Sequence, residues 1–147
     1  MRWRFADKLG GFRPWQALIG TKAVSLEEYS LLEPFGREGA MPRSLVLEAC
    51  VETARWLVAR SSEWTASCVL DGVEDLAFAR DAGMGHVLAI SIEVVGRDGD
   101  LLKASARVAC EQKQIAEGAI AVRVVPLDEG FDRGMVEGLW QELYAPA

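Results

Sequence analysis

The stretch Ser44-Leu-Val-Leu-Glu-Ala-Cys-Val-Glu-Thr-Ala-Arg-Trp-Leu-Val-Ala59 decides the fold of this chain. It contains no Gly or Pro, and apolar side chains surround most of a helix built from it. Because such a helix must be covered by protein on most sides, we predict a buried central helix over residues 44–59. Glu48, Glu52 and Arg55 are the exceptions. Their spacings of four and three place them on one narrow stripe, which either lines a site or is solvated and locally paired.

Segments on both sides of this helix have the residue types of strands. Apolar and β-branched residues bounded by turn signals predict strands over residues 17–24, 67–78, 86–95, 101–110 and 115–125. Arg97-Asp-Gly-Asp100 indicates a tight hairpin and Gln112-Lys-Gln114 a weaker one. Two successive hairpins form an antiparallel meander, so we predict an α+β fold whose sheet wraps around the long central helix.

The remaining segments predict connections and one more helix. Ser25 with Glu28 has the spacing of a capping box for a short helical turn, and residues 32–42 hold prolines and glycines typical of a loop. A final amphipathic helix is predicted within residues 129–147, packed on the domain or on a partner subunit. Its apolar residues recur at every fourth position: Phe131, Met135, Leu139 and Leu143.

Composition bounds the class of protein. With 147 residues and 50% hydrophobic content, the chain suits a single domain over residues 1–147. The net charge of −6 argues against a surface that tracks nucleic acid. No apolar run reaches the roughly 20 residues of a membrane helix, and the first residues lack a signal peptide's apolar centre, so we expect a cytoplasmic protein.

The cysteines and the histidine predict no metal site. Cys50, Cys68 and Cys110 are far apart in sequence, which is typical of buried free thiols in a reducing compartment. His86 is the one histidine that could join them in binding a metal ion.

Local motifs resemble the hot-dog fold of the β-hydroxyacyl carrier-protein dehydratases. Glu33-Pro-Phe-Gly36, Met41-Pro-Arg43 and Leu47-Glu-Ala49 are similar, without a gap, to the family's Gly-His-Phe-Pro, Met-Pro-Gly and Ile-Glu-Ala. Further short matches place the resemblance over roughly residues 17–125, and the final helix lies outside it. The weaker matches are Lys22–Ser25, Ala77–Phe78, Gly85–Leu88, Ala104–Val108 and Ala116–Gly118.

The sequence departs from the family pattern at positions that the family uses for catalysis. The resemblance places Pro34 at the family's catalytic His and Arg43 at the Gly that opens the central helix. Glu48 follows Pro34 by 14 residues, which is the family's spacing from His to its catalytic carboxylate. His86 falls on a structural turn position of the family, so we do not expect it to replace the missing base.

The resemblance also implies a set of residues around a bound substrate. Pro34, Phe35, Met41, Pro42 and Arg43 are the positions expected to contact it, with Glu48 as the catalytic residue. Arg43 either contacts a carrier's phosphopantetheine or acidic surface, or is a plain exposed arginine.

The implied ligand is an acyl thioester on acyl carrier protein or CoA, in fatty-acid or polyketide-type metabolism, with no cofactor. The family forms dimers with sites shared between subunits. The chain is therefore expected to be a homodimer or higher oligomer and a degenerate dehydratase, or to pair with a His-bearing hot-dog protein. The alternatives are an acyl thioesterase that uses Glu48 with water, and a scaffold or sensor that binds acyl thioesters without chemistry.

Overall fold

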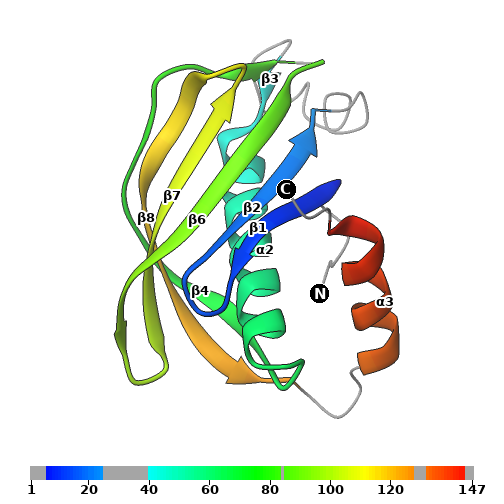
Figure 1. Ribbon diagram of the computed structural model, residues 1–147. Coiled ribbons are helices and arrows are strands. Elements are labelled where there is room, and N and C mark those ends of the chain that lie inside the picture. The colour runs from blue at the N-terminus through cyan, green and yellow to red at the C-terminus, as the bar shows by residue number, and fades with distance from the viewer. Residues whose placement is uncertain (1–5, 25–39, 84, 128–131, 145–147) are drawn as a thin grey trace.

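A six-stranded antiparallel sheet curves around one long helix (Figure 1). The computed structural model describes residues 6–24, 40–83, 85–127 and 132–144. In spatial order the sheet comprises β1 (Lys8–Arg13), β2 (Ala17–Ala23), β6 (Val87–Asp98), β7 (Leu101–Cys110), β8 (Lys113–Pro126) and β4 (Ala66–Phe78). Two short strands, β3 (Ala40–Met41) and β5 (Ala82–Gly83), form a separate antiparallel ribbon, and the helices are α2 (Arg43–Ser61) and α3 (Arg133–Leu143).

The core lies between α2 and the concave face of the sheet. Burial alternates along β6 and β7, because successive side chains of a strand point to opposite faces. The inward residues of these strands are Leu88, Ile90, Ile92, Leu102, Ala104, Ala106 and Val108, all at most 2% exposed. Helix α2 meets them with Ala49, Cys50, Ala54, Trp56, Leu57, Val58 and Ala59, so the predicted wrapped-helix architecture is confirmed.

Helix α2 packs tightly against β2 at Gly20. A Cβ added to Gly20 would lie 2.6 Å from Oγ1 of Thr53, so only glycine fits here unless the Thr53 side chain moves. The Thr53 hydroxyl donates a hydrogen bond to the Ala49 carbonyl at 2.8 Å, which favours the observed rotamer. Glycine at position 20 therefore allows the helix and this strand to approach closely.

The sequence predicted the position of one hairpin turn correctly and that of the other with an error of one residue. Gly99 has φ of +62° between β6 and β7, as its Asp-Gly signal predicts. The turn between β7 and β8 consists of Glu111 and Gln112, with φ of +50° and +66°, one residue earlier than predicted. The weaker signal misplaced this turn because neither residue is a glycine or an asparagine.

Two predictions about the first part of the chain need correction. Lys8–Arg13 forms strand β1, although its Gly10-Gly11 pair predicted an interruption. Gly11, with φ of +61°, lies at an irregularity in the pairing with β2, and the strand continues past it. The predicted loop 32–42 includes strand β3. Ser25 and Glu28 of the predicted capping box lie outside the described residues.

Helix α3 exists as predicted, and its buried face was assigned correctly only in part: Leu143 is buried and Leu139 packs against the core, but Met135 points outward, and Phe131 lies outside the described residues. Val136, Trp140 and Leu143 are buried, whereas Met135 is 56% exposed. A step of four residues turns a helix by 400°, so a row of such steps drifts around the helix and leaves the contact surface. Helix α3 lies beside β1 (Figure 1), and Tyr144 just after it forms a bridge with Leu9.

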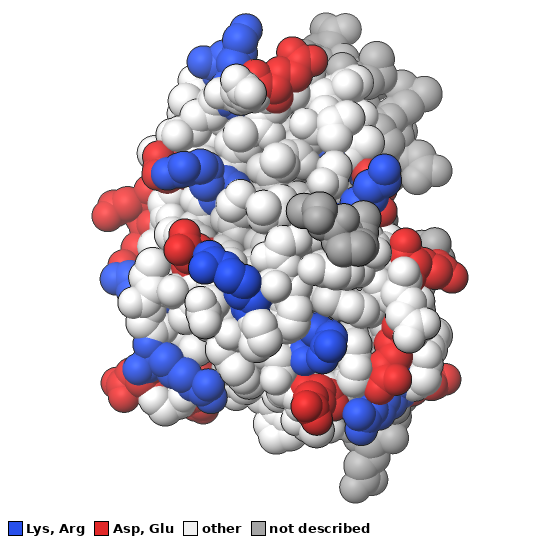
Figure 2. Space-filling model, viewed as in Figure 1, with Lys and Arg blue, Asp and Glu red and all other residues white. Residues whose placement is uncertain are grey.

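Charges of both signs are mixed over the face of the molecule in Figure 2. Four ion pairs join strands on the outer face of the sheet. Two join neighbouring strands, Arg107–Glu117 and Arg123–Asp71, and two reach across an intervening strand, Arg13–Glu93 and Lys103–Glu74. Among the described residues, no helix is long and apolar enough to cross a bilayer.

Candidate functional site

The start of helix α2 presents unused backbone donors. Pro42 is the N-cap residue in an extended conformation, and no side chain caps the helix. The N–H groups of Leu45 and Val46 donate to the Pro42 carbonyl at 3.0 and 3.2 Å. The N–H groups of Arg43 and Ser44 have no acceptor within the described part of the chain, and the first turn holds no acidic residue. The partial positive charge of this helix end is therefore available to an electronegative atom.

Arg43 is tied to the end of strand β4 by two contacts. Its Nε donates to Oδ1 of Asp81 at 3.2 Å, and its guanidinium carbon lies 4.9 Å from the centroid of the Phe78 ring. The side chain is 53% exposed. Arg43 thus joins the first turn of α2 to the segment after β4, a role that neither predicted alternative included.

Glu48 lies on the side of α2 that faces strand β4. Its Oε1 accepts a hydrogen bond from Nη1 of Arg55 at 3.3 Å, and Nε of Arg55 donates to the Cys68 carbonyl at 3.4 Å. The Glu48 side chain is 42% exposed and that of Arg55 is 18% exposed. The carboxylate is therefore open to solvent on one side and held on the other by a guanidinium anchored to β4.

Glu52 corrects the predicted stripe of charged residues. It is fully buried, and its carboxylate accepts a hydrogen bond from the Ala6 backbone N–H. Residues at a spacing of four differ by about 40° around a helix, which is enough to turn Glu52 away from the open side. The stripe is locally paired between Glu48 and Arg55, and Glu52 instead holds the segment before β1.

Strand β4 leaves its outer edge open beside this carboxylate. It pairs with β8 on one side, and no strand of the described ranges pairs with the other. Val69, Leu70 and Val73 are 39–44% exposed along it. Leu70 and Val73 stand opposite the buried Val122 and Ile120, so their side chains share the helix-facing side of the sheet with Glu48 and Arg55. An apolar, unpaired edge is a surface on which another chain can add.

The structure brings together only part of the predicted site. Pro42, Arg43 and Glu48 lie on the first turns of α2. Met41 is 1% exposed and packs in the core, so its side chain is not on the surface where a substrate would bind. Pro34 and Phe35 lie outside the described residues.

His86 is bound into a turn. Its ring Nδ1 accepts a hydrogen bond from the Gly83 backbone N–H at 2.9 Å, and the backbone N–H of His86 donates to the Gly83 carbonyl at 3.1 Å. Its carbonyl accepts from Val24 at 2.9 Å. These contacts are what a structural turn residue makes, and they use one ring nitrogen.

The three cysteines are free and buried. Burial raises the pKa of the Cys50 thiol to about 12, and burial raises that of Cys68 to about 12 against the charge of Arg55. Both therefore stay protonated near neutral pH and are poor nucleophiles. Within the ranges that the structure describes, no three His, Cys, Asp or Glu side chains lie together as a metal site would require.

Sequence reasoning missed the residues that hold the site. Asp81 and Cys68 follow the helix in sequence. No sequence motif predicts that Asp81 binds Arg43 or that the Cys68 carbonyl binds Arg55. The exposure of Leu70 and Val73 was also missed, because apolar residues in a strand read equally well as core.

Solved structures define the class of the fold. A structure of smu.793 from Streptococcus mutans bound to acetyl CoA aligns with a TM-score of 0.69 at 12% identity, covering 88% of this chain and 96% of that one. A hot-dog-like protein from Thermanaerovibrio acidaminovorans gives 0.67 at 17% identity, covering 88% and 92%. The dehydratase heterocomplex ApeI:P from Xenorhabdus doucetiae gives 0.66 at 14% identity, covering 86% and 84%. The chain has the hot-dog fold.

Sequence relatives include dehydratases at low identity. The chain is 25% identical over 122 residues to the 3-hydroxyacyl-[acyl-carrier-protein] dehydratase FabZ of Caulobacter sp. (strain K31), covering 81% of this chain and 75% of the relative. It is 26% identical over 113 residues to FabZ of Herpetosiphon aurantiacus, covering 72% and 79%. No family model matches the chain. The chain is thus a hot-dog protein distantly similar to FabZ dehydratases.

Proposed function

We propose that this chain binds acyl thioesters, as a dehydratase-like hot-dog protein whose reacting carboxylate is Glu48. The observation that carries the proposal is the position of Glu48. It is half exposed on the first turns of α2, beside the open edge of β4 and held by Arg55. Its spacing from Pro34 matches the family's spacing from His to carboxylate, and the similarity to FabZ supports the same substrate class.

The start of α2 supplies the second element of such a site. The N–H groups of Arg43 and Ser44, which have no acceptor among the described residues, can donate to the thioester carbonyl. The oxygen of that carbonyl gains negative charge when a neighbouring proton leaves or a nucleophile adds. Arg43 is held at Asp81, so its guanidinium lies near the entrance and its backbone at the carbonyl. A carrier's phosphopantetheine or the phosphates of CoA suit this cation.

A second hot-dog subunit completes the site across β4. Adding a strand to this edge satisfies its unpaired backbone groups and covers Leu70 and Val73. The acyl chain then runs between this apolar strip and the partner. The partner is a second copy or a related chain.

Dehydration of a β-hydroxyacyl thioester needs a base for the proton next to the carbonyl and an acid for the leaving hydroxyl. Proline at position 34 has no proton to give or accept, so the chain alone lacks the base. Loss of one such group lowers the rate by about 10²–10⁴-fold. We infer that dehydration, in fatty-acid or polyketide-type metabolism, occurs in a mixed dimer with a His-bearing partner. The similar structure of a dehydratase heterocomplex supports this arrangement.

The exposure of Glu48 favours thioester hydrolysis as a second candidate. A carboxylate that is open to solvent beside the start of α2 can contact a water molecule and orient it toward a bound thioester. A structurally similar hypothetical thioesterase from Streptococcus pneumoniae was solved with coenzyme A (TM-score 0.66, 11% identity), which supports this alternative.

Turnover measurements separate the candidates. Purified chain is assayed with β-hydroxyacyl and saturated acyl thioesters, alone and with a His-bearing hot-dog protein, in wild type and Glu48→Gln. Dehydration that needs the second protein and is lost in Glu48→Gln supports the mixed dimer. Hydrolysis by the chain alone, lost in the same variant, supports the thioesterase.

A matched variant controls for loss of a charge pair. Glu117→Gln removes the partner of Arg107 from a pair of 3.0 Å on the outer face of the sheet, and should change neither activity. Binding of acyl thioesters without turnover in any combination would leave a non-catalytic sensor. Absence of binding would refute the proposal.

A further inference from the structure

A cavity lies at the opposite end of α2 from Glu48. Its volume is about 370 Å³, and it opens between the last turn of α2 and helix α3. It is lined by Arg60, Glu63, Trp64, Arg133, Glu137 and Trp140. This size is within the range of small-molecule sites. Because α3 forms one wall and lies outside the stretch that resembles the dehydratases, the cavity is a feature separate from the thioester site.

The base of the cavity is aromatic and rigid. The indoles of Trp64 and Trp140 meet edge to face, with centroids 6.0 Å apart, and are 9% and 8% exposed. Trp56 packs against both, and Tyr144 stacks on Trp140 at 4.8 Å. The small exposed parts of the two indoles offer an apolar corner that cannot move without disturbing the cluster.

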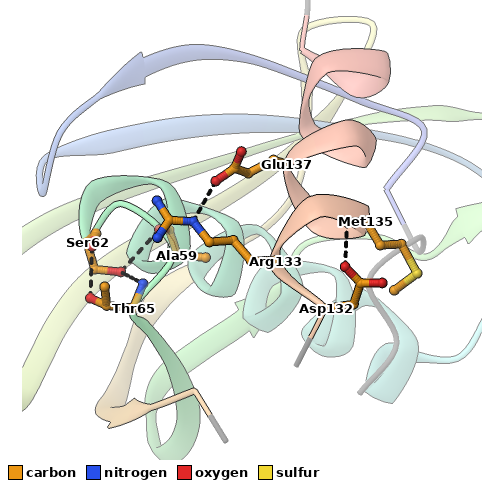
Figure 3. A network of polar contacts seen from close by, with 7 residues as sticks. All are labelled: Ala59, Ser62, Thr65, Asp132, Arg133, Met135 and Glu137. Carbon is orange, nitrogen blue, oxygen red and sulfur yellow. Dashed lines mark hydrogen bonds and ion pairs between the residues drawn. The ribbon is translucent and has the colours of Figure 1, made fainter. Parts of the chain in front are cut away.

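One cation and one anion on the α2 wall have no counter-ion among the described residues. Arg133 and Glu137 on α3 satisfy each other at 2.7 Å (Figure 3). By contrast, Arg60 has a π contact with Phe12 at 5.4 Å but no ion pair within the described residues. Glu63 likewise has no cationic partner among them. These two opposite charges are three positions apart and line the same cavity.

The backbone holds Glu63 and Trp64 in an uncommon conformation. Their φ values are +55° and +67°. The N–H of Glu63 donates to the Arg60 carbonyl at 3.2 Å and the N–H of Trp64 donates to the Ala59 carbonyl at 2.8 Å. This pair of hydrogen bonds closes the C-terminal end of many helices. Glycine is the usual residue at the position of Glu63, since other residues are strained there. The turn, drawn in Figure 3 with Ser62 and Thr65, directs both side chains to the cavity.

We propose that this cavity binds a small zwitterion of the α-amino-acid class with an aromatic or apolar side chain. The ligand carboxylate pairs with Arg60, whose fork of N–H donors suits it. The ligand ammonium pairs with Glu63 at the C-terminal end of α2, where the helix dipole also favours a cation. The side chain lies on the exposed indole surfaces of Trp64 and Trp140.

A matched series of probes tests each part of this assignment. The indole N–H signals of Trp64 and Trp140, assigned by Trp→Phe substitutions, are followed by NMR in titrations with L-phenylalanine, 3-phenylpropionate and 2-phenylethylamine. We expect saturable shifts with phenylalanine. The analogues that lack the ammonium or the carboxylate should bind at least about tenfold more weakly, because each loses one ion pair.

Two variants and a control complete the experiment. Arg60→Gln should weaken phenylalanine binding about tenfold and abolish its advantage over 2-phenylethylamine, and Glu63→Gln should abolish its advantage over 3-phenylpropionate. Arg107→Gln, on the outer face of the sheet, should change nothing. Equal affinity for the three probes, no saturable shift up to their solubility limits, or full affinity in Arg60→Gln would overturn the proposal. None of these readouts depends on thioester binding.

Discussion

Single residues decide how closely α2 packs on the sheet, and Gly20 is the clearest case. Gly20→Ala would place a methyl group 2.6 Å from the Thr53 hydroxyl, so we expect a loss of about 1–3 kcal/mol in the free energy of unfolding. Gly96→Ala, where no atom lies within 4 Å of the added Cβ, should be close to neutral. Urea unfolding of both variants measures this difference.

The same contact can be checked by a double variant. In a Thr53→Ala background, Gly20→Ala should cost clearly less than in the wild type, because the clashing hydroxyl is gone. Equal costs in both backgrounds would mean that the strain lies elsewhere.

The helix stripe shows what a sequence can and cannot predict about a residue. Periodicity placed Glu48, Glu52 and Arg55 near each other, and the ion pair between Glu48 and Arg55 follows from that. The burial of Glu52 does not, because it depends on the Ala6 backbone, 46 positions away, arriving as a donor. A pattern within one helix carries no information about such a partner.

At the scale of elements, the positive φ of Glu63 at the C-terminal end of α2 affects both stability and the proposed ligand binding. Glu63→Gly should raise the free energy of unfolding by about 0.5–1 kcal/mol, since glycine adopts the positive φ without strain. Gln141→Gly, in the last turn of α3, should lower it by up to about 1 kcal/mol, because glycine is disfavoured at a helical position with negative φ. Chemical denaturation tests both, and a destabilised Glu63→Gly would show that the side chain holds the turn. If the zwitterion site is real, the stabilised variant should also lose amino-acid affinity.

Elements were predictable where their signal is local. The alternation along β6 and β7, the Asp-Gly turn and the Gly- and Pro-free helix all depend on neighbours in sequence, and each appears within a few residues of its expected bounds. Strand β1 was missed because its glycines are accommodated by pairing with β2. The short β3–β5 ribbon joins segments about 40 residues apart and has no local signal.

The whole molecule should lose stability in alkali because of its buried thiols. Unfolded cysteines lose their protons above about pH 9, whereas folded Cys50 and Cys68 keep theirs until about pH 12. The unfolded state then binds fewer protons, so stability falls as pH rises between these values, by about 1.4 kcal/mol per unit for each thiol. A Cys50→Ala/Cys68→Ala variant should show a shallower slope in unfolding measured from about pH 8 to about pH 10.

The open β4 edge predicts an assembled protein. Light scattering should give at least twice the chain mass of 16.1 kDa. Val69→Lys, on the outer face of β4, should shift the protein to the monomer, because a lysine on an edge opposes strand addition. Val95→Lys, at a position 62% exposed on β6, is the control and should leave the mass unchanged. A wild-type monomer at high concentration would indicate that the partner is a different chain.

Affinity for a hydrolysis-resistant 3-hydroxyacyl-CoA thioether tests the central claim most directly, compared by calorimetry between the wild type and Val69→Lys. The side chain of Val69 lies on the outer face of β4, away from the proposed acyl strip. Where the wild type assembles with itself, a site shared across β4 predicts saturable binding that becomes at least about tenfold weaker in the monomeric variant. Where it needs another hot-dog chain, the same loss should appear in the mixed complex. Undiminished binding by a folded Val69→Lys monomer would contradict the account.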